Sequence, residues 1–217
     1  MTGANGHDQL SAQSSAFGID LTLVDTRPAP VLHGGDGWID YGIAGSYYYS
    51  RPRMTATGSL TYDGAQLPVN GTAWFDHQWG DFVTAGVGGW DWFAINLADG
   101  TDVMAYLIRA PDGSYPIAYA TVAGADGVSE VAAGDFTVTT LESWTSAATG
   151  ARYPAGWHFA VPGSSIDLTL KPTVADQELD TRASTGVVYW EGSQAVTDTA
   201  TGTADGEAYV ELTGYFP

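Results

Sequence analysis

The sequence predicts an all-β protein made of antiparallel β-barrels, with a complete barrel in the C-terminal part and a partial one before it. Apolar residues occupy every second position in segments such as 17–23 (FGIDLTL) and 166–170 (IDLTL), which is the period of a half-buried strand. Asp-Gly pairs recur between such segments, and this dipeptide supplies the positive φ angles of tight hairpin turns. Helix signals are scarce. Many short strands joined by hairpin turns indicate a barrel or a sandwich.

The N-terminal part is expected to contribute the partial barrel. Residues 1–16 are polar and glycine-rich, so we expect them to be disordered. The first strand is expected over 17–23. Residues 17–87 offer four or five strands, which is too few to close a barrel by themselves.

Residues 88–217 contain enough strands for a closed barrel, because about eight strands leave room for one small ligand or a filled core. The strands are expected at 90–97, 102–109, 117–122, 136–141, 157–161, 166–172, 187–194 and 208–213. Hairpin turns are expected at the Asp-Gly pairs 63–64, 99–100, 112–113, 126–127 and 205–206.

Charge and composition exclude several classes of function. The chain has 217 residues with 25 acidic and 7 basic side chains, a net charge of −18, so it should repel nucleic acids and anionic membranes. The absence of cysteine excludes disulfides and thiolate sites, and the four histidines are scattered, so we expect no metal. Residues 1–16 do not resemble a signal peptide, and no run of about 18 apolar residues predicts a membrane span. The compartment is left undetermined.

The segment 71–80, GTAWFDHQWG, places a carboxylate and an imidazole among large aromatic side chains. Alternate side chains of a strand point to opposite faces, which groups Asp76 with Trp74 and His77 with Trp79. One interpretation is that both polar groups are structural and satisfied by their neighbours. The other is that they line an apolar cavity and act on a ligand.

The segment 89–100, GWDWFAINLADG, repeats this pattern. Trp90 and Trp92 share one face of the expected strand, and Asp91 shares the other with Phe93. The tryptophans are interpreted as core aromatics at a barrel entrance or as part of a site. Asp91, between two indoles in sequence, is a second carboxylate candidate.

A third cluster, SYYYSRPRM at 46–54, brings basic residues next to tyrosines. Tyr49 and Arg51 are candidates for binding an anion or a carbonyl group. The alternative is that the arginine stacks on tyrosine and pairs with one of the many acids. His33 precedes Gly34 and Gly35 and is expected to be a turn residue.

Several blocks in this order resemble the AttH/CrtC family, over residues 17–215. The blocks are VLHGGDGW (31–38), SYYYSRPRM (46–54), GTAWFDHQWG (71–80), GWDWFAINLADG (89–100), MAYLIR (104–109), YPAGWHF (153–159), DQEL (176–179), YWEG (189–192) and YVELTGY (209–215). The resemblance implies two lipocalin-like barrels in tandem. Because relatives carry a further stretch before the part that matches from residue 17, we expect the start of the first barrel to be missing here.

The family includes carotenoid 1,2-hydratases (hydroxyneurosporene synthases), with lipocalin-like pericyclases as more distant relatives. The resemblance therefore implies acid-assisted addition of water to a C=C bond of an apolar isoprenoid or polyene, without a cofactor or metal. Such a reaction needs a proton donor in an apolar pocket, stabilisation of a carbocation, and a base. The residues of this chain that could supply these groups are His77 for proton transfer, Asp76 or Asp91 as its acid/base partner, and Trp74, Trp79, Trp90 and Trp92 around the substrate.

Two other functions stay open at this stage. A pericyclase would mainly fold a polyene into a reactive conformation, and a non-catalytic carrier would only bind an apolar molecule. No Gly-x-Ser-x-Gly sequence is present, so a hydrolase of that type is not predicted. The incomplete edge of the first barrel is expected to favour a homo-oligomer.

Overall fold

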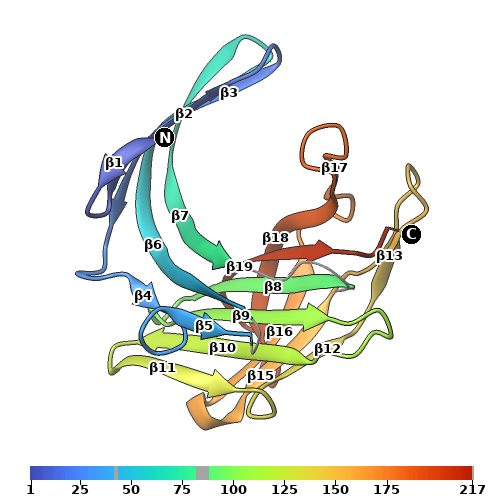
Figure 1. The fold of residues 1–217 in the computed structure, drawn as a ribbon. Coiled ribbons are helices and arrows are strands. Elements are labelled where there is room, and N and C mark those ends of the chain that lie inside the picture. The colour runs from blue at the N-terminus through green and yellow to red at the C-terminus, as the bar shows by residue number, and fades with distance from the viewer. Residues whose placement is uncertain (42–43, 82–87, 217) are drawn as a thin grey trace. The chain divides into compact units, whose positions relative to one another are not determined.

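The computed structural model describes residues 1–41, 44–81 and 88–216, and these residues form an almost entirely antiparallel β-structure (Figure 1). The chain divides into two compact units, Met1–Asp81 and Phe82–Pro217, here called the N-terminal and C-terminal units. The boundary predicted between residues 87 and 88 adjoins the segment 82–87, which lies outside the described residues.

The N-terminal unit is a seven-stranded sheet ordered β1-β2-β3-β6-β4, with β5 and β7 also paired to β6. Its strands are β1 Thr2–Ala4, β2 His7–Gln13, β3 Phe17–Asp25, β4 Val31–Leu32, β5 Trp38–Asp40, β6 Gly45–Tyr62 and β7 Ala65–Asp81. Leu23, Met54 and Ala56 form its small buried core.

Strands β6 and β7 form a long hairpin that organises this sheet (Figure 1). Asp63 and Gly64 join them with φ angles of 48° and 76°, as the Asp-Gly pair predicts. The register shifts between Arg51 and Met54, where Pro52 lacks the N–H that a regular ladder needs. On either side of this bulge β6 has different neighbours, with β4 and β5 before it and β3 after it.

The prediction of disorder for residues 1–16 is wrong. Residues 2–4 and 7–13 are strands β1 and β2, and His7 through Gln13 pair with Val24 through Gly18 of β3. The segment carries few buried side chains, so its polar composition gives no core signal. Backbone hydrogen bonds to an existing sheet edge order it instead.

The C-terminal unit is built on a ten-stranded sheet ordered β11-β10-β9-β8-β19-β18-β16-β15-β12, with β17 paired to β18, and a separate pair β13-β14. The bounds are β8 Gly89–Leu97, β9 Asp102–Arg109, β10 Ile117–Gly124, β11 Gly127–Ala132, β12 Thr137–Thr140, β13 Ser143–Thr145, β14 Arg152–Pro154, β15 Trp157–Val161, η1 Pro162–Ser164, β16 Ile166–Pro172, β17 Glu178–Asp180, β18 Val188–Asp198 and β19 Ala204–Thr213.

One apolar cluster fills the inner side of this sheet and includes residues from both ends of the strand order. Phe93 of β8 contacts Trp157 and Phe159 of β15, with ring centroids 5.6 and 6.0 Å apart. Phe136, just before β12, lies 6.3 Å from Phe159. Contacts between such distant strands require the sheet to curl, and Figure 1 shows its strands in a curved arrangement. The sequence predicts eight strands around a filled core or a small ligand. The structure has a ten-stranded sheet whose inner side is filled by side chains.

The predicted strands of residues 88–217 are all present, and the structure adds β11, β13, β14 and β17. One predicted turn is wrong, because Asp205 and Gly206 lie inside β19. Gly206 has φ 152°, and a Cβ atom there would lie 2.2 Å from the carbonyl oxygen of Asn96. Close approach of two backbones therefore explains this glycine, rather than a hairpin turn.

Candidate functional site

Asp76 accepts hydrogen bonds from three side chains of the N-terminal unit. The Tyr48 hydroxyl donates to Oδ2 at 2.6 Å, the Trp74 indole N–H donates to Oδ1 at 2.7 Å, and the Ser50 hydroxyl also donates to Oδ1. Strand geometry explains the cluster: Ser50 is directly opposite Asp76 in the β6–β7 register, and Trp74 is two residues earlier on the same face. Ser50 is fully buried and Tyr48 nearly so.

The hydrogen bonds leave one position on the Asp76 carboxyl for a proton. A carboxylate offers about four lone-pair sites, two on each oxygen. Oδ1 accepts from both Ser50 and Trp74, whereas Oδ2 accepts from Tyr48. Among the contacts of the described residues, the remaining site is on Oδ2. A proton bound to Asp76 is therefore expected on Oδ2.

Opposing effects set the pKa of Asp76. Burial raises it above the ordinary aspartate value, because a charged carboxylate is poorly solvated there, and the hydrogen bonds from Ser50, Tyr48 and Trp74 lower it by a smaller amount. The net direction is upward. The same three donors stabilise the carboxylate once the proton has left, so the group has the properties of a general acid.

His33 is joined to this cluster through Ser50. Its Nε2 lies 2.7 Å from Ser50 Oγ, and its ring centroid is 4.4 Å from that of Tyr48. His33 does begin a glycine turn, in which Gly34 has φ 71°. The imidazole itself is fully buried, however, which the prediction of a simple turn residue missed. Burial lowers the pKa of His33 to about 3, so the ring is neutral near pH 7.

Replacing His33 with glutamine should change how stability depends on pH. Between pH 6.5 and about 3 the unfolded chain protonates His33 and the folded chain does not, so acidification favours unfolding. The wild type should therefore lose up to about 1.4 kcal/mol of unfolding free energy per pH unit relative to the variant in this window. Urea unfolding at several pH values measures the difference. A gap between the two proteins that stays constant from pH 7 to pH 4 would contradict the buried, neutral imidazole.

His77 lies on the opposite face of β7 from Asp76, as the strand period predicts. Its ring centroid is 4.6 Å from that of Trp79 and 5.5 Å from that of Tyr49. Tyr47 continues this row, 5.3 Å from Trp79. His77 is exposed, and Trp79 is 44% exposed. The structure thus brings His77 together with Trp79 but separates it from the Asp76 carboxyl.

Arg51 forms an ion pair with Asp25 of β3 and lies 6.0 Å from the ring centroid of Tyr49. These contacts fit the structural alternative, in which arginine stacks on tyrosine and pairs with an acid. Pro52 and the bulge come directly after Arg51 in the sequence. The Arg51–Asp25 ion pair therefore also connects β6 to β3 where the β6–β7 register changes.

Asp91 lies in the C-terminal unit and is buried on the inner side of β8. Tyr115 donates to its Oδ2 at 2.6 Å, and the Tyr215 hydroxyl lies 3.0 Å from both carboxyl oxygens. The Arg109 guanidinium lies 3.7 Å from the Tyr215 ring centroid and donates to the Thr213 carbonyl at 2.6 Å. Burial raises the pKa of Asp91, while the tyrosines and Arg109 oppose this. The cluster ties the end of β19 to β8 and β9.

Trp90 and Trp92 do not surround Asp91. They alternate with it along β8 and lie on the outer side, and the Trp90 indole N–H donates to Glu211 at 2.6 Å. Asp91 therefore lies between the two indoles in sequence only, and the opposite faces of β8 on which they lie are those that the two-residue period of a strand predicts.

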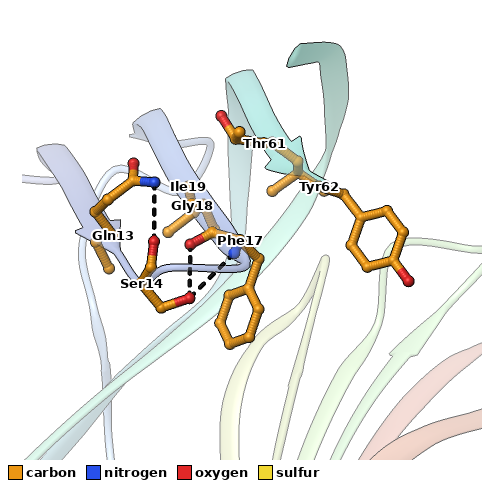
Figure 2. A pocket seen from close by; sticks show the side chains of 9 residues that line it. Gln13, Ser14, Phe17, Gly18, Ile19, Thr61 and Tyr62 are labelled. Carbon is orange, nitrogen blue, oxygen red and sulfur yellow. Dashed lines mark hydrogen bonds between the residues drawn. The ribbon is translucent and has the colours of Figure 1, made fainter. Parts of the chain in front are cut away.

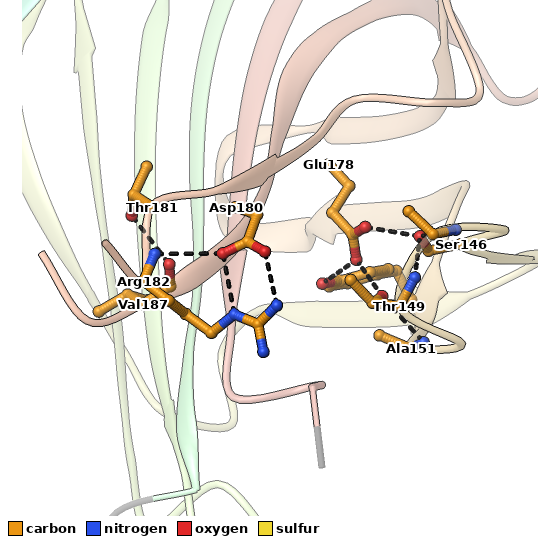
Figure 3. A network of polar contacts seen from close by, with 10 residues as sticks. Ser146, Thr149, Ala151, Glu178, Asp180, Thr181, Arg182 and Val187 are labelled. Carbon is orange, nitrogen blue, oxygen red and sulfur yellow. Dashed lines mark hydrogen bonds and ion pairs between the residues drawn. The ribbon is translucent and has the colours of Figure 1, made fainter. Parts of the chain in front are cut away.

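A second polar network in the C-terminal unit joins β17 to the turn after β13 (Figure 3). Glu178 accepts hydrogen bonds from Ser146, Thr149 and Tyr153, the last at 2.9 Å. Nearby, Arg182 pairs with the exposed Asp180 at 2.6 Å. These three hydroxyl groups satisfy the Glu178 carboxylate, which indicates a structural role.

An apolar groove of about 460 Å³ lies where the β2–β3 and β6–β7 hairpins end (Figure 2). Phe17 and Tyr62 flank it and are 63% and 68% exposed. Its polar groups bond to one another, since Ser14 Oγ accepts from the Phe17 N–H at 3.0 Å and donates to the Phe17 carbonyl oxygen. No carboxylate, imidazole or basic side chain lines the groove. It can hold an apolar molecule but offers no general acid.

Within residues 1–41, 44–81 and 88–216, the structure holds no group of three or more His, Asp or Glu side chains placed to bind a metal ion. No helix in this part of the chain is long and apolar enough to cross a membrane.

Comparison with known proteins identifies the family. The family model described as AttH-like matches residues 1–215. The structure is similar to a crystal structure of a candidate AttH from Nitrosomonas europaea, with TM-score 0.90 and 33% identity over 99% of this chain and 67% of that one. It also has the fold of kievitone hydratase from Nectria haematococca, with TM-score 0.77 and 23% identity over 96% of this chain and 64% of that one.

This chain therefore spans about two thirds of the length of both structures. No match is found among curated proteins. The lipocalin-like, all-β fold expected from the sequence is confirmed. The chain is a member of the AttH-like family.

Proposed function

We propose that this protein is a hydro-lyase that adds water to a C=C bond of an apolar isoprenoid or polyene, in the manner of a carotenoid 1,2-hydratase, with Asp76 as the proton donor. The observation that carries the proposal is the Asp76 carboxyl, which is part-buried, accepts from three donors and has a position on Oδ2 that no described residue fills. The hydratase fold and the AttH-like family support the reaction class.

The chemistry needs few groups. Protonated Asp76 gives its Oδ2 proton to one alkene carbon, and the electron pair of the C=C bond forms the new C–H bond. A carbocation is left on the other carbon. Water then adds to the cation, and the Asp76 carboxylate accepts the proton that the water loses, which restores the acid. Tyr48, Ser50 and Trp74 stabilise the carboxylate between these steps.

A non-catalytic carrier is the second candidate, and the groove between the hairpin ends favours it. Its volume of about 460 Å³ falls within the usual range for small-molecule sites, and its lining is apolar and uncharged. In a carrier, Asp76 and its donors would have a structural role.

Mass spectrometry separates the candidate functions. The purified chain is incubated with an acyclic carotenoid, and we expect a product heavier by one water molecule. A product of unchanged mass but different absorbance would indicate a pericyclase instead. Binding that quenches tryptophan fluorescence without any product would support the carrier and contradict the hydratase.

A further inference from the structure

Ser50 is one of the three donors to Asp76, and His33, which contacts Ser50, has no role in the reaction as described. Both are fully buried, and they come from different parts of the N-terminal unit. His33 follows β4, which pairs with β6 through Val31 and Ser50. The backbone of His33 also donates to the Tyr48 carbonyl at 3.1 Å. The pairing of Val31 with Ser50 and the backbone hydrogen bond of His33 thus hold the imidazole beside Ser50.

Counting protons fixes the direction of each hydrogen bond. A serine hydroxyl has one proton, and Ser50 donates it to Asp76 Oδ1. The 2.7 Å contact between Ser50 Oγ and His33 Nε2 must then be donated by the imidazole. His33 is therefore the tautomer with the proton on Nε2. Since burial keeps the ring neutral, it donates without adding a positive charge next to the carboxyl.

We propose that His33 is a positioning residue for Asp76: its Nε2–H holds the Ser50 hydroxyl in the orientation that donates to Oδ1, and the two side chains thereby set the proton affinity of that carboxyl. The inference deepens the proposed function and rests on it, because the proton affinity of Asp76 matters to the reaction only if Asp76 is the acid. The alternative is that His33 and Ser50 only pack against their neighbours and do not affect the proton affinity of Asp76.

Other groups near Asp76 do not replace this effect. On β6 the Tyr48 phenol donates to Oδ2, and on β7 the Trp74 indole donates to Oδ1. Arg51 follows Ser50 in sequence but points to the other face of β6, where it pairs with Asp25. Among the described side chains that bond to Asp76, none carries a positive charge. Ser50 is therefore the donor to Asp76 whose hydroxyl is oriented by a residue outside β6 and β7, namely His33.

The test measures the pKa of Asp76 by carbon NMR of protein labelled at the aspartate carboxyl carbon, with Asp76→Asn identifying the signal. Ser50→Ala removes a donor to the carboxylate, so the pKa should rise by about one unit, a tenfold increase in proton affinity. His33→Phe removes the group that orients Ser50 and should produce a smaller rise. His33→Gln should restore the wild-type value, since its amide N–H can replace Nε2–H.

The double variant His33→Phe, Ser50→Ala provides the control for a purely structural role. Because His33 acts through Ser50, the double variant should have the same Asp76 pKa as Ser50→Ala alone. Circular dichroism establishes that each variant is folded. An Asp76 pKa that is the same in wild type, Ser50→Ala and His33→Phe would overturn the inference.

No substrate is used in this experiment, so its result is separate from that of the proposed function. A shifted pKa in a protein that adds no water would leave the positioning role standing and reject the hydratase. An unchanged Asp76 pKa in a protein that does add water would reject the positioning role and leave the hydratase standing.

Discussion

Asp76→Asn should reduce the rate of water addition by about 10²- to 10⁴-fold, the usual contribution of a general acid. The amide keeps the size of the carboxyl and can still accept hydrogen bonds from Tyr48 or Trp74, but it has no acidic proton to give to the alkene. Turnover is measured as the water-adduct peak formed per unit time from an acyclic carotenoid. Binding of the carotenoid should change little, because the substitution removes the reacting proton and keeps the size of the side chain.

Asp20→Asn is the matched control, since Asp20 is exposed on β3 of the same unit and should have no effect on the rate. His77→Gln and Asp91→Asn test the two other residues to which the sequence assigns acid–base roles. His77 is exposed among aromatic rings, and Asp91 bonds to Tyr115 and Tyr215. If either of these variants abolished turnover while Asp76→Asn remained fully active, the general acid would not be Asp76.

Leu168→Ala should lower the free energy of unfolding of the C-terminal unit by about 2 to 5 kcal/mol. Leu168 on β16 is 1% exposed and belongs to the cluster that fills the inner side of the sheet. Truncating it loses the transfer free energy of the side chain and leaves a cavity that close-packed neighbours cannot fully collapse. Urea or thermal unfolding, followed by near-ultraviolet circular dichroism, gives the change.

Leu141→Ala in the same unit removes the same atoms from a side chain that is 51% exposed, and should change stability by only about 0.5 kcal/mol or less. Equal effects of the two substitutions would show that the cluster around Leu168 is not a packed core.

Much of the strand pattern could be predicted because it depends on local periodicity. The alternation in 166–170 and the Asp63-Gly64 turn express interactions within a few residues of one another, and both are present in the structure. The same local reasoning failed for residues 2–13 and for Gly206. Pairing with a distant strand orders the former, and a close backbone contact with Asn96 explains the latter.

In the candidate site, too, some features follow from local periodicity and others depend on distant contacts. That Asp76 and His77 face opposite sides follows from the two-residue period of a strand, and so does the separation of Asp91 from Trp90 and Trp92. The partners of Asp76 do not follow from it, because Tyr48 and Ser50 reach the carboxyl only through the β6–β7 register. The run Tyr47-Tyr48-Tyr49-Ser50 pairs with residues 76–79 of β7, and this alignment depends on the Asp63-Gly64 turn and the Arg51–Met54 bulge together.

The sequence alone determined the all-β class, the family resemblance and the faces of each strand, because these depend on spacing along the chain. Only the tertiary structure decided that His33 contacts Ser50, that Asp76 accepts hydrogen bonds from three side chains, and that apolar side chains fill the inner side of the C-terminal sheet. Register and burial bring together residues far apart in the chain, and it is burial together with hydrogen bonding that sets which carboxyl can hold a proton.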